Sequence, residues 1–143
     1  MNKFYVDSCI YLNLWNKEGS SKFGKPYWQI AQEFFDKFNH KNSIFYYSGF
    51  IIKELKFKMA PNDFQSRIKL FDKKKFRSIF VPTNLLPIAR KIESETYFAI
   101  SFYDILHLLL AKKSNSILVT RDKKLLEAAK KYSAKFGRPE DFL

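Results

Sequence analysis

The sequence contains only one cysteine, Cys9, among its 143 residues. A single thiol excludes an intramolecular disulfide, and it also excludes a zinc site built from cysteines. Chains without disulfides are typical of reducing compartments. We therefore expect a cytoplasmic protein that is long enough to fold around its own core without covalent cross-links.

The sequence also lacks a long apolar run and a recognisable signal peptide. The longest stretch of its apolar middle without lysine or arginine, residues 94–111, contains Glu95, Asp104 and His107. It falls short of the ~20 apolar residues that a transmembrane helix needs. The apolar N-terminus is interrupted by Asp7, and no small-residue cleavage site follows it. We expect a soluble protein that does not associate with a membrane.

Acidic residues are scarce relative to basic ones. The chain has 14 Asp and Glu against 26 Lys and Arg, which gives a net charge of +12. A solvated helix face explains any one pair of lysines, but the total is large for one small domain. It indicates a polyanionic partner and favours nucleic acid. The lysines form one triple and three pairs, which are Lys73–Lys75, Lys112–Lys113, Lys123–Lys124 and Lys130–Lys131.

Apolar residues make up 46% of the chain, and their pattern predicts one folded domain spanning residues 1–143. Short continuous apolar runs predict buried strands at residues 3–7, 43–47, 77–82 and 116–120. Helical periodicity and capping residues predict helices at residues 25–41, 48–60, 62–74, 83–96, 101–114 and 121–137. A short helix after residue 7 is expected to break up at Gly19, Ser20, Ser21 and Gly24, and residues 138–143 form a tail. This alternation predicts an α/β fold with a parallel sheet covered on both faces.

Acidic side chains stand at the ends of the most apolar segments. Asp7 closes the first strand, and Asp122 follows the last strand by two residues. Asp104 lies three residues after Ser101 in a capping-box-like first turn, and Glu54 lies one to two turns into the helix after the second strand. Strand ends and the helices that follow them share one edge of a parallel sheet, so all four acids can converge there. Capping by Asp104 and Asp122, and solvent exposure of Glu54, remain alternatives.

Four carboxylates in one place repel each other, and a divalent cation removes that repulsion. A ligand set made only of oxygen atoms favours Mg²⁺ or Mn²⁺ over zinc. Such ions orient and deprotonate a water for in-line attack on a phosphodiester. The acids and the excess of lysine therefore predict a metal cup within a basic surface.

On these residues the sequence resembles the PIN-domain family of metal-dependent ribonucleases, and within it the VapC-type toxins of VapBC toxin–antitoxin pairs. The matching segments are "FYVDSCI", "SGFIIKELKFK", "SFYDILHLLLAKKSNS" and "ILVTRDKKLLEAAKKY". The resemblance implies a three-layer α/β/α sandwich with a central parallel sheet and Mg²⁺- or Mn²⁺-dependent endonucleolytic cleavage of RNA. It also implies that Asp7, Glu54, Asp104 and Asp122 bind the metal and carry out catalysis. Family members often form homodimers, and the toxins bind a small antitoxin protein.

Several neighbours of the acids are candidates for supporting roles. Ser8 and Thr120 match small hydroxyl positions, which bind metal-bound water, hold a carboxylate, or act as ordinary caps. We interpret His107 as a structural residue or a support for the metal ligands rather than a general base, because metal-activated water is a sufficient nucleophile. Arg121 is a candidate phosphate contact, with solvent exposure as the alternative.

Two alternatives to the toxin hypothesis remain open. Residues 16–29 form a long connection for a toxin, which keeps a PIN nuclease of RNA processing as an alternative. A catalytically silent PIN-like RNA-binding module is the other, although it has no reason to keep four converging acids. A response-regulator receiver needs adjacent acids after the first strand, and a phosphatase of the Asp-x-Asp type needs an acid at position 9. Both are disfavoured by the sequence Asp7-Ser8-Cys9.

Overall fold

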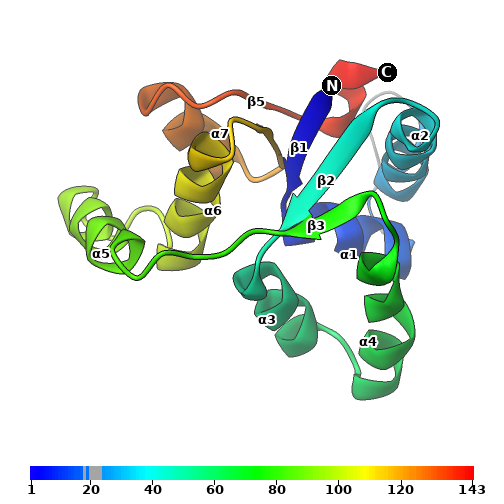
Figure 1. Cartoon of the computed structure of the whole chain (residues 1–143), viewed down its shortest axis with the longest axis horizontal. Coiled ribbons are helices and arrows are strands. Elements are labelled where there is room, and N and C mark those ends of the chain that lie inside the picture. Colours follow the sequence, from blue (N-terminus) through cyan, green and yellow to red (C-terminus); the bar gives the residue numbers. More distant parts are fainter. Residues whose placement is uncertain (18, 20–23) are drawn as a thin grey trace.

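The computed structural model describes residues 1–17, 19 and 24–143. Within these residues a five-stranded parallel sheet has the strand order β3-β2-β1-β4-β5 (Figure 1). The strands are β1 (Asn2–Val6), β2 (Ser43–Tyr47), β3 (Phe76–Ser78), β4 (Ile117–Val119) and β5 (Phe136–Gly137). The central strand, β1, pairs with β2 on one side and with β4 on the other, and Val6 is opposite Val119. The predicted parallel sheet is therefore confirmed, and the ends of β1 and β4 are neighbours.

Helices cover both faces of this sheet. Figure 1 shows α6 and α7 on one side of the strands and α1 and α2 on the other, which confirms the three-layer α/β/α arrangement. The helices are α1 (Ser8–Asn16), α2 (Tyr27–Asn39), α3 (Gly49–Lys58), α4 (Pro61–Arg67), α5 (Leu85–Glu95), α6 (Phe102–Lys113) and α7 (Lys123–Lys131), with 3₁₀ turns η1 (Ile68–Asp72) and η2 (Pro139–Phe142). Among the described residues, no helix combines the length and apolarity needed to cross a bilayer.

The third strand is shorter than the predicted 77–82. The Ile79 N–H still donates to the carbonyl of Tyr47 at 2.7 Å, but the chain then leaves the sheet, and Phe80 is 82% exposed. Pro82 has no N–H to offer a ladder, so the apolar run could not continue as a paired strand. The helix predicted at 62–74 is likewise divided into α4 and η1.

The C-terminal segment differs most from the prediction. The helix expected at 121–137 ends at Lys131, because Ser133 has a left-handed φ of 57° and the Ala134 N–H turns back to the Ala129 carbonyl at 2.8 Å. The chain then forms β5 beside β4, a strand that the sequence did not predict. Gly137 packs closely against Phe142, because a Cβ there would lie 2.7 Å from the Phe142 ring.

The break after the first helix was predicted correctly where it is described. Helix α1 is nine residues long, ending at Asn16, and Gly19 and Gly24 have φ values of +94° and +83°. Such values suit glycine, which has no Cβ to clash with the backbone. The predicted break points Ser20 and Ser21 lie outside the described residues.

Aromatic rings from α2 and the strands fill the larger part of the core. Phe34 is fully buried, and its ring packs edge-on against Phe4 with centroids 5.1 Å apart. The rings of Phe35 and Phe45 also pack edge-on against the ring of Phe34. Edge-to-face geometry is the favourable one for phenyl rings. This packing fixes the position of β1, and with it the position of Asp7.

Replacing Phe34 by alanine tests the importance of this packing. We expect Phe34→Ala to lower the free energy of unfolding by about 3–5 kcal/mol, because it opens a cavity among aromatic rings. Urea unfolding followed by circular dichroism measures the loss. Phe80→Ala is the matched control, and it should change stability by less than about 0.5 kcal/mol since its ring is in solvent. Equal losses in the two variants would contradict the assignment of the core.

Candidate active site

Asp7 is a buried carboxylate held by neutral donors. It ends β1, caps α1, and is only 4% exposed. Its Oδ1 accepts the Ser8 backbone N–H at 2.8 Å, and its Oδ2 accepts the Thr120 hydroxyl at 2.7 Å and the Cys9 thiol at 3.3 Å. Burial, followed by the charge of Asp7, raises the pKa of the Cys9 thiol, which therefore stays protonated. Thr120 thus holds a carboxylate, one of the three roles considered for it, while Ser8 contributes its backbone N–H.

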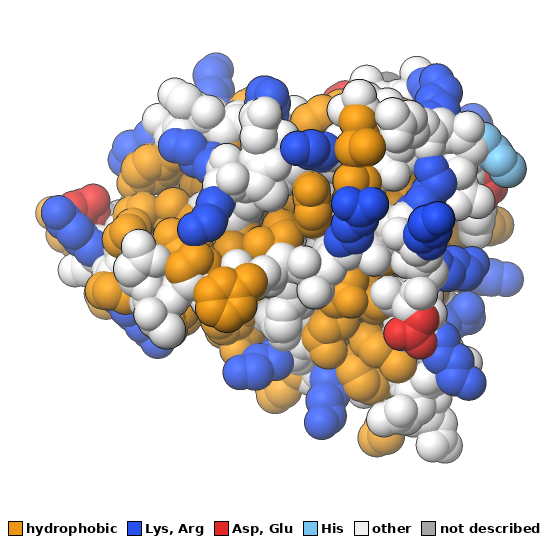
Figure 2. Space-filling model, in the orientation of Figure 1, with side chains coloured by type: hydrophobic (Ala, Val, Ile, Leu, Met, Phe, Trp, Pro, Cys, Tyr) orange, Lys and Arg blue, Asp and Glu red, His pale blue; other side chains and the backbone are white. Residues whose placement is uncertain are grey.

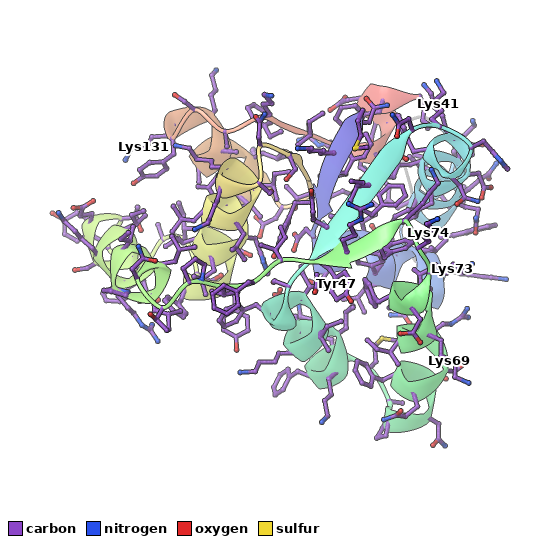
Figure 3. All side chains as sticks on the ribbon, viewed as in Figure 1. Lys41, Tyr47, Lys69, Lys73, Lys74 and Lys131 are labelled. Carbon is purple, nitrogen blue, oxygen red and sulfur yellow. The ribbon has the colours of Figure 1, made fainter. Side chains whose placement is uncertain are left out.

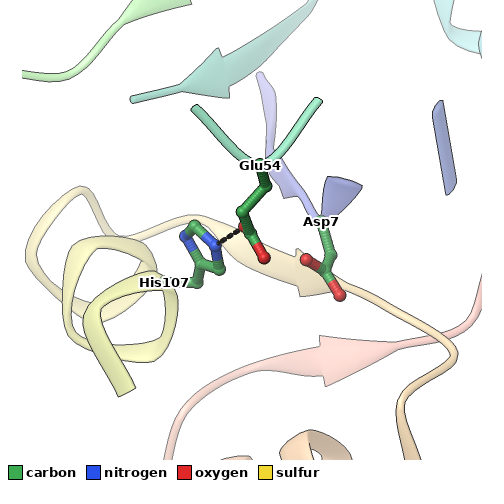
Figure 4. Close-up of side chains that lie close together, drawn as sticks. All are labelled: Asp7, Glu54 and His107. Carbon is green, nitrogen blue, oxygen red and sulfur yellow. Dashed lines mark hydrogen bonds and ion pairs between the residues drawn. The ribbon is translucent and has the colours of Figure 1, made fainter. Parts of the chain in front are cut away.

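Glu54 is positioned by a buried chain of hydrogen bonds. Its Oε1 lies 2.5 Å from Nε2 of His107, which projects from α6 and is fully buried (Figure 4). The Nδ1 of His107 lies 2.7 Å from the Tyr5 hydroxyl, which in turn lies 2.8 Å from Oγ of Ser48. The contact with His107 therefore holds the Glu54 carboxylate in place.

The pKa of His107 reflects this environment. Burial alone lowers the pKa, but the hydrogen bond to Glu54 and the negative charges of Asp7, Glu54 and Asp104 raise it above the usual 6.5. The partner Tyr5 was missed from the sequence. A tyrosine in a fully buried strand was the available signal, since its hydroxyl needs a partner there.

Asp104 lies in the first turn of α6, as predicted. The Ser101 side chain caps that helix by accepting the Asp104 backbone N–H at 3.1 Å. Burial and the charges of Asp7 and Asp122 raise the pKa of the Asp104 carboxyl to about 7, with Glu54 adding to the rise and His107 opposing it. No hydrogen bond reaches its carboxylate from the described residues. The charges of all three other predicted acids thus raise the pKa of Asp104, and within the described residues no hydrogen bond occupies its carboxylate oxygens.

Asp122 caps α7, which was the structural alternative for it. Its Oδ1 accepts the backbone N–H groups of Lys124 and Leu125 at 2.9 and 3.4 Å. Its own N–H donates to the Thr120 hydroxyl oxygen at 3.1 Å, so Thr120 links Asp122 to Asp7. Capping occupies Oδ1 and leaves the charge of Asp122 acting on Asp104.

The structure thus gathers the four predicted acids to different degrees. Asp7, Glu54 and His107 each offer one atom, and these atoms lie within 4.8 Å of one another. Asp104 and Asp122 are outside this closest group and border it electrostatically. No lysine or arginine is among the groups that shift the pKa of Asp104. Oxygen atoms in excess of nearby positive charge suit a hard divalent cation such as Mg²⁺ or Mn²⁺.

The sequence model of the PIN domain matches residues 4–131. The chain belongs to the PIN-domain family. No curated protein sequence is significantly similar to it. The predicted resemblance is confirmed at the level of the family, and the four predicted acids all lie within the matched residues.

Solved structures with the same fold support this assignment. VapBC2 from Rickettsia felis, bound to a DNA fragment from its promoter, matches with a TM-score of 0.70 and 15% identity over 95% of this chain and 98% of the other. FitAcB from Neisseria gonorrhoeae matches with a TM-score of 0.60 and 11% identity over 96% and 98%. A domain of a functionally unknown protein from Methanocaldococcus jannaschii matches with a TM-score of 0.60 and 18% identity over 96% and 91%. At these identities the likeness is one of fold.

Arg121 of this PIN domain is not exposed to solvent, which corrects one of the two expectations for it. Its side chain is only 11% exposed, and it pairs with Glu140 at 2.9 Å. The guanidinium also lies over the ring of Tyr27, 3.9 Å from the centroid. A phosphate contact would have to share these donors with Glu140, and it stays a prediction.

Lysines of the PIN domain project from several sides of the molecule (Figure 3). Lys41, Lys69, Lys73 and Lys74 project from the side formed by α2 and η1, and Lys131 lies at the opposite end (Figure 3). The Arg121 guanidinium, close in sequence to Asp122, is already paired with Glu140. The four acids are therefore a local group of negative charges in a chain whose net charge is +12.

The raised pKa of Asp104 predicts a stability that depends on pH and on divalent cations. The folded carboxyl keeps its proton up to about pH 7, against 3.8 for an unperturbed one, so the folded state binds more protons and stability falls as pH rises between these values. In chelator above pH 7, Asp104→Asn should be more stable than wild type by on the order of 1 kcal/mol or more. Near pH 4 the two should be equal.

Thermal unfolding in chelator and in Mg²⁺, across this pH range, measures the effect. Mg²⁺ should stabilise the wild type more than Asp104→Asn, because the ion binds the charged carboxylate. Asp72→Asn controls for the loss of one negative charge, because Asp72 is exposed and is not one of the four predicted acids. If the unfolding temperatures of wild type and Asp104→Asn change in parallel with pH, burial does not hold the proton on Asp104.

Proposed function

We propose that this PIN-domain protein is a Mg²⁺- or Mn²⁺-dependent endoribonuclease and the toxin of a type II toxin–antitoxin pair. The observation that carries the proposal is the group of four acids, in which burial and the charges of Asp7, Asp122 and Glu54 raise the pKa of Asp104 to about 7. A basic protein that keeps such a group uncompensated gains from it when a cation binds. The choice of RNA rests on the resemblance to the ribonucleases of the family.

The side chains divide the work of such a site between them. Asp7, fixed by Ser8, Cys9 and Thr120, and Glu54, fixed by His107, would hold the cation. When bound, Mg²⁺ or Mn²⁺ polarises the scissile phosphate and lowers the pKa of an attacking water. Asp104 and Asp122 complete the acidic set. The unoccupied oxygens of Asp104 can orient that water by accepting a hydrogen bond from it.

Cleavage by substituted proteins tests the proposal. In Mg²⁺ or Mn²⁺ the purified chain should cut a mixed structured RNA, and excess EDTA should stop it. Asp7→Asn, Glu54→Gln, Asp104→Asn and Asp122→Asn should each lose at least about 100-fold in rate, the upper range for loss of a residue that merely supports a metal ligand. Asp122→Asn is especially informative, because asparagine still caps a helix and removes only the charge.

Asp72→Asn, prepared in the same way, controls for contaminating nuclease and should retain full activity. Cutting that persists in all four site variants would disprove the catalytic assignment. A protein that binds RNA without cutting it would favour the silent RNA-binding module. Activity confined to one structured precursor would favour the RNA-processing nuclease.

An antitoxin is part of the same proposal. The fold likeness to VapBC2 supports it, as does apolar surface around α5 that this chain leaves in solvent. Tyr97 and Phe98 are 91% and 71% exposed, and both have left-handed φ values of 52° and 61°. Exposed apolar clusters of this kind mark protein interfaces. Co-purification with the product of the adjacent upstream reading frame tests this partner, and light scattering of the chain alone tests the homodimer.

We further infer that residues 1–143 act as one nuclease domain in the cytoplasm.

A further inference from the structure

We propose that a cavity beside the acids is a stacking subsite for a nucleobase of single-stranded RNA, next to the phosphate that is cut. The inference rests on the proposed function, and it names a part of the substrate site that the four acids do not include. The cavity has a volume of about 690 Å³ and lies between α3, α5 and the start of α6. This volume is within the range of small-ligand sites.

The cavity adjoins the acids at Glu54, which lines the cavity and also belongs to the group formed with Asp7 and His107. Phe57 and Lys58 lie three and four residues after Glu54, so both are its neighbours on the surface of α3. Ser101, on the opposite wall, starts the helix that carries Asp104. A strand whose phosphate lies at the acids would therefore place an adjacent nucleotide in this cavity.

Three aromatic side chains line the cavity, and one of them has a free face. Phe57 is 90% exposed, and none of the described aromatic rings packs against it. Phe102 is covered on one face by the Arg90 guanidinium, 3.7 Å from its centroid, and Tyr103 packs edge-on against Phe50. A rigid wall and an exposed phenyl ring are what a base needs in order to stack.

The positive charge around the cavity favours RNA over an apolar peptide as its occupant. The rim carries Lys53, Lys58 and Arg90, and the only acid in the lining is Glu54 of the cup. Within the described part of the chain neither Lys53 nor Lys58 forms an ion pair, whereas Arg90 pairs with Glu93 at 2.9 Å. Figure 2 shows apolar side chains gathered over α3 and α6 with basic side chains around them. Aromatic faces bordered by cations match bases bordered by phosphates.

A combined protein and RNA substitution experiment tests the subsite. Fluorescence anisotropy measures binding of a short labelled oligoadenylate, and of versions in which one adenine at a time is replaced by an abasic ribose. The proteins are Asp7→Asn, which prevents cleavage, and Asp7→Asn with Phe57→Ala. Phe57→Ala should weaken binding of the intact oligonucleotide about fivefold or more. At one abasic position the two proteins should bind equally, because the base and the ring then have no contact to lose.

Phe80→Ala is the matched control, since its phenyl ring is equally exposed and lies outside the cavity. It should leave every affinity unchanged. Lys58→Gln should lower the slope of log affinity against log salt by about one, while Lys131→Gln, on α7, should affect it less. If the abasic positions weaken both proteins alike, the stacking subsite is wrong, and the cavity is left to an apolar segment of a protein partner.

The subsite and the nuclease fail in different ways. Coupling between Phe57 and one base, in a chain that never cuts RNA, would retain the subsite and remove the catalytic proposal. Metal-dependent cutting by wild type without such coupling would retain the nuclease and overturn the subsite. A chain that binds no oligonucleotide would overturn both.

Discussion

The candidate site depends on one electrostatic constraint, which is that the buried carboxylate of Asp7 is held in place by neutral groups. Asp7 accepts hydrogen bonds from a backbone N–H, a hydroxyl and a thiol, none of which carries a positive charge. These donors fix the geometry of the carboxylate without cancelling its charge. The uncancelled charge reaches Asp104 and raises its pKa. A lysine in place of Thr120 would hold Asp7 as firmly but would remove the reason for a cation to bind.

A series of hydrogen-bonded side chains, running from Ser48 through Tyr5 and His107, holds Glu54. Burial raises the pKa of Tyr5, so its hydroxyl stays neutral. When His107 is neutral, Tyr5 can donate to Nδ1 and Ser48 to Tyr5; when it is protonated, both donations reverse and every group keeps a partner. Glu54 accepts from Nε2 in either state. The chain can therefore hold Glu54 in one position over a range of pH while the charge of the site changes.

Sequence patterns predicted those features that depend on local order. Continuous apolar runs fixed β1, β2 and β4, and these strands carry Asp7 and Asp122 to one edge of the sheet. The sequence pattern did not predict features that are determined by contacts between residues distant in the sequence. The two residues of β5 become a strand only because β4 is beside them, and no periodicity shows in so short a segment. The bond between Tyr5 and His107 joins residues 102 positions apart. Arg121 is buried by Tyr27 and Glu140, which no local pattern brings to it.

The two scales of charge in this molecule act in opposite directions on a polyanion. The net charge of +12 favours the approach of a polyanion, but the four acids would repel a phosphate at the proposed cleavage site. A cation bound at the acids reverses the sign of that last interaction. Because such coupling is reciprocal, a phosphate at the site must also strengthen binding of the cation. If RNA and a divalent ion bind here as proposed, each therefore strengthens the binding of the other.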